Sequence, residues 1–341
     1  MTSVPVDPPA NPVGARRMSP VLRTVLQRLG LGLLTLFLVS ILIFAAIEAL
    51  PGDFARAILG QSATPDTVAA FQKELGLDRP PVERYFDWIG GILQGDFGES
   101  FASVGSFSGD KRTVLSLVLP RLENTLMLAG VTALIAVPLS LGLGLLAALY
   151  RNSWLDRGIN VLTLAAISVP EFFVAYVLML FLAVKWHLFH AVAMVSADMS
   201  LAEQLQRMAL PVLTLVLGTV AHMMRMTRAA VVNLLANPYV EMARLKGLRP
   251  AVVILRHALP NAWAPIVTIV ALYLAYLIAG VVVVEVVFVY PGIGQLMVDA
   301  VTTRDVPVVQ ACALIFATVY ILLNLFADIV GIVTNPRLLH P

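Results

Sequence analysis

The chain is long, apolar and poor in charge. It has 341 residues, of which 59% are hydrophobic and 13% charged, and its mean hydropathy is +0.87. Soluble proteins average about 45–50% apolar and about 25% charged residues, so a soluble enzyme or a disordered regulator is excluded. A net charge of +2 does not indicate nucleic-acid binding, and the single Cys312 excludes an intrachain disulfide or a CxxC metal site. This is the composition of an integral membrane protein.

The first 22 residues are predicted to form a disordered tail, because five prolines fall between residues 5 and 20. Met18 is an alternative start of translation. Residues 23–341 are predicted to form one transmembrane domain.

Six apolar stretches are each long enough for a membrane-spanning helix, which takes roughly 20 residues. They cover residues 30–49, 124–149, 158–183, 210–224, 264–289 and 308–333, each to within a few positions. The fourth is the weakest, because Arg225 and Arg228 shorten it unless it begins before Leu210. The alternating pattern of a membrane β-barrel is absent, so the predicted fold is all-α.

Positive charge assigns the two sides of the membrane. Arg and Lys gather before the first span, between the second and third, between the fourth and fifth, and after the last. The short loops of the other side hold only Lys185, Arg207 and Arg304. Because cytoplasmic loops carry the excess of positive charge, both termini are predicted to face the cytoplasm.

The outer loop, residues 51–123, is polar enough to fold outside the lipid. Val82, Tyr85, Phe86 and Ile89 follow the i, i+3, i+4, i+7 pattern of a helix with one apolar face. Gly90-Gly91 is predicted to end this helix. The loop serves either as a packing lid or as a docking surface for an external partner.

The inner loop, residues 225–260, is basic and is divided by Pro238 and Pro260. Pro238 suits the first turn of a short helix, Tyr239 to Leu245, which is expected to stop at Gly247, where the chain turns. A second amphipathic piece, Val252 to Leu259, follows. One interpretation is a basic loop that only fixes topology; the other is a compact elbow that another protein contacts.

The inner loop resembles the "EAA" loop of membrane subunits of bacterial ABC importers, with the pattern E-A-A-x3-G-x9-I-x-L-P. The matching residues are Glu241, Ala243, Gly247, Leu259 and Pro260, with the family spacing intact. Two positions depart from the pattern, since Met242 replaces the first alanine and His257 the isoleucine.

Other motifs narrow the resemblance to the peptide and nickel permeases of the B type. Residues 285–294 resemble E-x-V-F-x-x-P-G-x-G, and residues 304–310 resemble the R-D-x-P-x-x-Q that opens the final span. Residues 51–53, 75–80 and 95–98 resemble motifs of the long external loop, and residues 335–337 stand where the family often has D-P-R. The likeness runs from Arg23 onward.

The resemblance implies a type I ABC importer permease with six transmembrane helices. Such a subunit pairs with a homologous second permease, contacts two ATP-binding subunits in the cytoplasm, and receives substrate from an extracytoplasmic binding protein in the bacterial inner membrane. No GxxxxGK[ST] motif occurs in the chain, so ATP and Mg are expected in the partner subunits and no enzyme activity is expected here.

The resemblance also implies which residues carry function. Coupling to the ATPase subunits is expected from the elbow, with Gly247 as its turn. The coupling residues are Tyr239, Glu241, Ala243, Arg244, Lys246, Gly247, Leu248, Leu259 and Pro260. Glu241 is expected to pair either with a basic residue of an ATPase subunit or with Arg244. Pro291, Gly292 and Gly294 are expected to form a turn that takes part in gating.

Four carboxylates lie in or near the spans, where burying an ionisable group is costly. Glu48 is expected at the outer interface. Glu171 follows Pro170 at a break in the third span and faces either a hydrophilic cavity or its own helix end. Glu285 either binds a substrate ammonium or braces the turn at Pro291, and Asp328 is expected to form a polar contact between helices.

Two rival interpretations were considered. His187 and His190 on an outer loop suggest a metal contact, but a third ligand is missing, so no metal site is predicted. A proton-coupled secondary transporter is the alternative function, based on the intramembrane carboxylates. Di- or oligopeptides are the leading substrate, while nickel and glutathione remain open.

Overall fold

The computed structural model describes residues 20–49, 54–104, 112–196, 198–253, 256 and 259–333. Within these ranges the chain is helical, with one isolated bridge between Glu99 and Thr113. The helices are α1 (Pro20–Glu48), α2 (Phe54–Leu59), η1 (Gly60–Ser62), α3 (Pro65–Glu74), α4 (Pro81–Leu93), α5 (Phe101–Val104), α6 (Val114–Leu149), α7 (Trp154–Ser168), α8 (Glu171–Leu178), η2 (Met179–Lys185), α9 (Leu201–Arg207), α10 (Ala209–Leu235), α11 (Pro238–Leu245), α12 (Pro250–Val252), α13 (Leu259–Phe288), α14 (Ile293–Thr303) and α15 (Val306–Val333).

Five of these helices, α1, α6, α10, α13 and α15, are long and apolar enough to cross a membrane. The remaining predicted span, the third in chain order, is a bent pair of helices. Here α7 and the continuous segment α8–η2 meet at a bend of 101°. The bend falls at Val169 and Pro170, as expected, because proline lacks the N–H that would continue the helix. The structure therefore has five helices able to span a membrane, and six as predicted if this bent pair is counted as one broken span.

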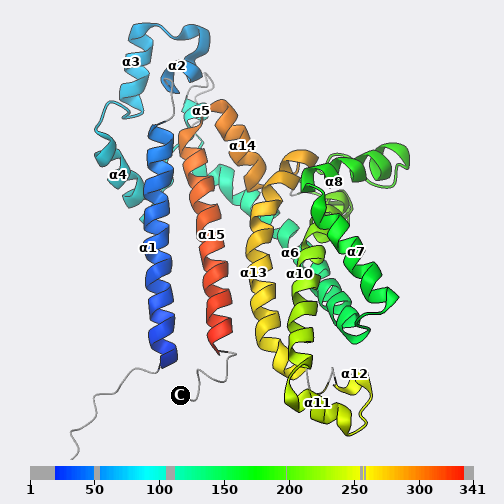
Figure 1. Cartoon of the computed structure of the whole chain (residues 1–341). Helices are drawn as coiled ribbons and strands as arrows, with labels where there is room; N and C mark the ends of the chain where they lie inside the picture. The colour runs from blue at the N-terminus through cyan, green and yellow to red at the C-terminus, as the bar shows by residue number, and fades with distance from the viewer. Residues whose placement is uncertain are drawn as a thin grey trace, which may run out of the picture.

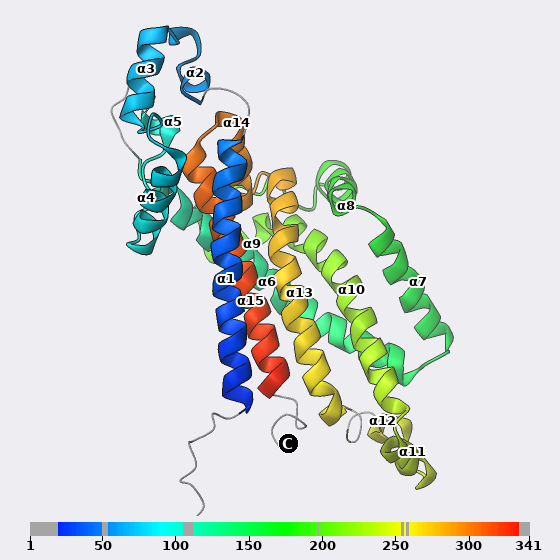
Figure 2. The same ribbon diagram turned by 60° about the vertical axis from the view of Figure 1, so that its left-hand side comes forward.

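The centre of the bundle is formed by α6, α10, α13 and α15, with α7 on the outside of α10 and α1 on the outside of α15 (Figures 1 and 2). Leu128, Leu215, Val281 and Phe288 belong to the main buried cluster. Gly144 of α6 lets α10 approach closely, because a Cβ there would lie 2.9 Å from Thr227. Small residues at such crossings are typical of membrane helices.

Helix α1 is mostly exposed, and Ser40 is the only buried residue among its described side chains. It packs against α15, where Arg28 and Asp328 form an ion pair at 2.9 Å. Asp328 thus makes the predicted polar contact between helices. The exposed leucines of α1 suit contact with lipid chains, which are as apolar as leucine.

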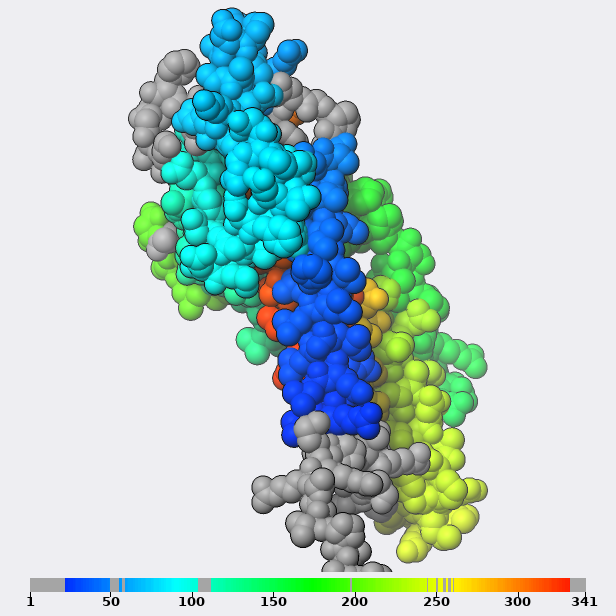
Figure 3. Space-filling view, turned by 90° about the vertical axis from the view of Figure 1, so that its left-hand side faces the viewer, coloured from blue at the N-terminus to red at the C-terminus, as the bar shows by residue number. Residues whose placement is uncertain are grey.

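The outer loop forms a cap of short helices, α2 to α5, at one end of the bundle, and Figure 3 shows this cap above and beside α1. The amphipathic helix predicted around residue 85 is α4. The Tyr85 hydroxyl hydrogen-bonds the Ser40 hydroxyl at 2.9 Å, and Arg84 pairs with Glu48 at 2.6 Å. This contact of α4 with α1 is the packing arrangement expected of a lid.

Several predicted boundaries were wrong. Helix α1 begins at Pro20, inside the predicted tail; residues 1–19 of that tail lie outside the described ranges. Helix α4 continues through Gly90-Gly91 to Leu93, and α6 begins at Val114, so the outer loop ends before residue 123. Helix α10 runs past Arg225 and Arg228 to Leu235, so the inner loop is only residues 236–258.

Candidate functional site

The elbow is a short helix, α11, that follows the end of α10 after a tight turn (Figure 1). Its inner face is apolar: Val240 and Ala243 are buried against the ends of α10 and α13. Its outer face exposes Tyr239, Met242 and Leu245, with Leu245 at 77% exposure. Helix α11 is therefore fixed to the bundle by one face, and its other, apolar face is left uncovered by the described residues.

Gly247 ends the elbow with a φ of +77°, a conformation in which glycine avoids the steric penalty of other residues. Glu241, Lys246 and Leu248 are exposed around it. Leu259, the first residue of α13, packs on the cluster beneath α11, and Pro260 follows it inside α13 rather than before the helix. The Arg244 side chain and half of the second amphipathic piece lie outside the described residues, so pairing of Glu241 with Arg244 stays a prediction.

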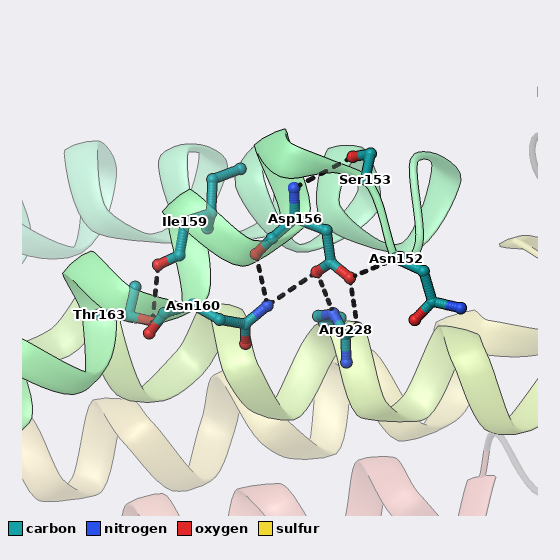
Figure 4. Close-up of polar contacts among 7 residues, drawn as sticks. All are labelled: Asn152, Ser153, Asp156, Ile159, Asn160, Thr163 and Arg228. Carbon is teal, nitrogen blue, oxygen red and sulfur yellow. Dashed lines mark hydrogen bonds and ion pairs between the residues drawn. The ribbon is translucent and has the colours of Figure 1, made fainter.

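A polar network joins α7 to α10 near the elbow (Figure 4). Arg228 donates two hydrogen bonds to the buried Asp156 carboxylate, from Nε at 2.7 Å and Nη2 at 2.8 Å. The same carboxylate accepts from the Asn160 amide at 2.7 Å and the Asn152 backbone N–H at 2.9 Å. A paired, fully hydrogen-bonded charge of this kind fixes the orientation of two helices. Sequence analysis missed the network.

Glu171 lies at the break of the third span, and its carboxylate reaches between α10 and α13. Glycines on both helices make room for it: a Cβ on Gly280 would lie 3.2 Å from the carboxylate, and one on Gly218 would lie 3.4 Å away. No side chain or backbone N–H of the described residues donates a hydrogen bond to it. The N-cap residue of α8 is Pro170, which makes no side-chain cap hydrogen bond.

Glu171 lines a cavity of about 780 Å³ bounded by α7, α8, α10 and α13. Most of its wall is apolar, and the polar groups are few: Thr214 and Thr219, with His222 of α10 and Tyr273 and Tyr276 of α13. The His222 and Tyr273 rings stack with centroids 6.0 Å apart, and Tyr273 is 5.9 Å from Tyr276. An apolar cavity with a few convergent polar groups is the usual form of a small-molecule site.

Glu285 is fully buried near the C-terminal end of α13, where its carboxylate has several hydrogen-bond donors. Thr125 of α6 donates at 2.6 Å, and the backbone N–H groups of Gly294 and Gln295 donate at 2.7 and 3.2 Å. A Cβ on Gly292 would overlap the carboxylate itself. The contacts of Glu285 are those of a brace for the turn at Pro291.

The motifs of the outer loop meet the start of α15, although they are far apart in the sequence. Asp305 is buried and accepts hydrogen bonds from the Ser100 hydroxyl and from the Phe101 N–H at 3.0 Å. Residues 75–79, 96–99 and 306–310 supply walls of one cavity of about 300 Å³. At its rim, a hydrogen bond to the Asp87 carboxylate raises the pKa of Arg79 above its ordinary value.

Within the described residues, no three His, Cys, Asp or Glu side chains gather closely enough to hold a metal ion. The structure therefore offers two sites of interest, the elbow and the Glu171 cavity. A bundle of apolar helices of this length belongs to the class of multi-pass membrane proteins.

The family follows from comparison with known proteins. Residues 140–340 match the family described as binding-protein-dependent transport system inner membrane component, and residues 21–129 match the N-terminal part described for such membrane components. The chain belongs to this family, the permease subunits of ABC importers.

Two relatives match almost the full length of the chain. The probable peptide ABC transporter permease protein y4tP of Sinorhizobium fredii is 34% identical over 314 residues, 92% of this chain and 98% of the relative. The glutathione transport system permease protein GsiC of Escherichia coli is 37% identical over 319 residues, 93% and 99% of the two chains. The chain is thus a peptide-type importer permease, and the proton-coupled alternative loses its support.

Proposed function

We propose that this chain forms half of a heterodimeric pore for di- or oligopeptides. The other half is a homologous permease, two ATP-binding subunits lie in the cytoplasm, and an extracytoplasmic protein delivers the substrate. The family description supports a binding-protein partner, and the names of the relatives support a peptide-like substrate. The chain itself holds no cofactor and catalyses no reaction, since ATP and Mg bind to the partners.

The observation that carries the proposal is the two-faced elbow. Val240 and Ala243 fix α11 to the bundle, while Tyr239, Met242 and Leu245 stay exposed beyond the end of α10. Exposed apolar side chains on a short helix are costly unless another protein covers them. The ATP-binding subunits are the partners that we assign to this face, with Glu241, Arg244, Lys246 and Leu248 at its edge.

The mechanism follows from how α11 is attached. ATP binding closes the two ATPase subunits, and the elbow held by each one moves with it. Because α11 shares a buried cluster with α10 and α13, this motion passes to both helices. The ion pair of Asp156 with Arg228 extends it from α10 to α7 and so to the Glu171 cavity. This is a two-state rigid-body switch driven by different contacts in each state.

We place the elbow on the cytoplasmic side of the inner membrane, with both termini on that side, because the basic residues gather there. The turn at Pro291, Gly292 and Gly294 then lies on the outer side. Glu285 and Thr125 attach this turn to α6, so the turn stays in place while the gate moves.

Gly247→Val tests the coupling role. A β-branched residue is strained at a φ of +77°, so the elbow takes another path and misses its partner. We expect ATP-dependent peptide uptake by the reconstituted transporter to fall at least about tenfold, while insertion of the chain is unchanged. Gly130→Val, at an open position on α6, is the matched control. Normal uptake by Gly247→Val contradicts the proposal.

Cross-linking tests the partner directly. With Met242→Cys on the exposed face of α11, a bifunctional reagent is expected to join this chain to an ATP-binding subunit, while Leu33→Cys on exposed α1 is not. Uptake that is abolished by a proton ionophore but independent of ATP favours the proton-coupled alternative instead.

A further inference from the structure

The Glu171 carboxylate differs from three other carboxylates of the bundle in having no partner among the described residues. Asp156, Glu285 and Asp328 each accept hydrogen bonds or pair with arginine. Glu171 has neither within the described part of the chain, yet it is half-buried and points between Gly218 and Gly280 into the large cavity. A half-buried anion without a cation in its own chain is a site at which a cationic group of a ligand gains a strong contact.

A cation lies further along α10, the helix that carries Gly218. Arg225 is exposed, and it follows the cavity residue His222 by one turn of α10. Arg225 lies on the same face of α10 as Gly218 and His222, because the three residues follow the i, i+4, i+7 spacing of a helix. Unlike its neighbour Arg228, Arg225 has no carboxylate partner among the described residues. Glu171 and Arg225 therefore carry opposite charges, have no ion-pair partner among the described residues, and lie at different levels along α10.

The separation of these charges suits a short peptide. Gly218 marks the level of Glu171 on α10, and the seven residues from Gly218 to Arg225 span roughly 10 Å at a rise of about 1.5 Å per residue. An extended peptide spans about 3.3–3.6 Å per residue, so about three residues bridge this length. The aromatic rings of His222, Tyr273 and Tyr276 lie between, where they offer contact to peptide side chains.

We propose that the cavity binds the two free termini of a short peptide, the α-ammonium at Glu171 and the α-carboxylate toward Arg225. This assignment rests on the proposed function, peptide import, and adds to it the orientation in which the peptide is bound. If the elbow lies on the cytoplasmic side, the amino terminus of the bound peptide points outward and the carboxyl terminus points to the cytoplasm. The permease then selects for unblocked ends independently of the binding protein.

The test uses the assembled transporter in nanodiscs without the binding protein, so that delivery does not affect the result. The probe is a tripeptide with a photoreactive central residue, in three forms: free, N-acetylated and C-amidated. Labelling of this chain is measured for the wild type, Glu171→Gln and Arg225→Gln. Glu203→Gln and Arg157→Gln remove matched charges from exposed positions outside the cavity.

We expect Glu171→Gln to reduce labelling by the free tripeptide at least about tenfold, the loss of one charge-assisted hydrogen bond, and to leave labelling by the N-acetylated form unchanged. Arg225→Gln is expected to reduce labelling by the free tripeptide by a similar factor and to leave labelling by the C-amidated form unchanged. The control variants should label as the wild type does.

Two results overturn the assignment. In one, all three peptides lose labelling equally, which indicates a general disturbance of the cavity; in the other, neither variant changes any of them. ATP-dependent uptake of the free tripeptide by the complete transporter separates this failure from a wider one. If the wild type takes up no peptide, the proposed function fails; if it does, only the assignment of the termini is lost.

Discussion

Glu171 and Glu285 are two carboxylates of the same bundle with opposite surroundings. Glu285 is closed in by α6, α13 and the start of α14, and donors reach both of its oxygens. Glu171 has two glycines and a cavity around it. Both interrupt apolar helices, and sequence composition alone does not tell them apart.

The difference teaches how to interpret a carboxylate in a membrane protein. Burial of charge is costly in either place, but at Glu285 the chain itself supplies the compensating donors. Such a group stabilises the fold, and Asp156, which is paired with Arg228, is a second example. Where the chain supplies no compensation, the group is available to a ligand. Stability should therefore depend on the first kind and transport on the second.

The largest effect is expected from Arg228→Ala, which leaves Asp156 buried without its ion-pair partner. Breaking a buried pair in this way costs about 3–5 kcal/mol, which SDS unfolding of the purified transporter in mixed micelles measures. Arg157→Ala, directly after Asp156 in the sequence but exposed, is the control. A loss below about 1 kcal/mol for Arg228→Ala would place the network among weak surface pairs.

Gly292→Ala should follow, because the added methyl group overlaps the Glu285 carboxylate. Displacing that carboxylate from its donors is expected to cost about 1–3 kcal/mol, measured in the same unfolding experiment. Gly142→Ala on α6, where nothing lies within 4 Å of a Cβ, is the control. Unchanged stability would show that Glu285 has room to move.

Gly280→Ala is expected to affect uptake and spare stability. Its methyl group lies 3.2 Å from the Glu171 carboxylate and pushes it into the cavity, while alanine favours the helix over glycine. We expect uptake of a short peptide to fall by about threefold to tenfold, and Gly218→Ala, at 3.4 Å, to have the weaker effect. The reverse order would argue against this position of the carboxylate.

The smallest change in stability is expected for Glu171→Gln. Because no hydrogen bond or ion pair within the described chain is lost, the free energy of unfolding should stay within about 0.5 kcal/mol of the wild type. Glu285→Gln in parallel should lose more, since its donors face a neutral group. If the two variants are equally destabilised, the contrast between the sites disappears.

Much of the fold could be predicted from the sequence, because apolar length, proline and glycine act locally. The six spans, the break before Glu171 and the turn at Gly247 all come from such local signals. The length of α10 could not be predicted, because the charge of Arg228 is compensated by Asp156, which is 72 residues away in the sequence.

The sites were predictable in part for the same reason. The family resemblance located the elbow, but Glu171 and Glu285 were left with two roles each. What separates them is the position of Thr125, 160 residues from Glu285, and of two glycines on different helices. Contacts of this kind depend on tertiary packing and leave no periodic trace along the chain.

The attachment of α1 to α15 has a consequence for biosynthesis. Helix α1 is the first described span to leave the ribosome, whereas α15, its main contact in the bundle, is the last. Before α15 is made, the exposed leucine-rich surface of α1 faces the bilayer, and its charged residues, Arg23, Arg28 and Glu48, lie toward the ends of the helix. Arg28 meets Asp328 only after α15 has been made, so this edge of the bundle closes late in the synthesis of the chain.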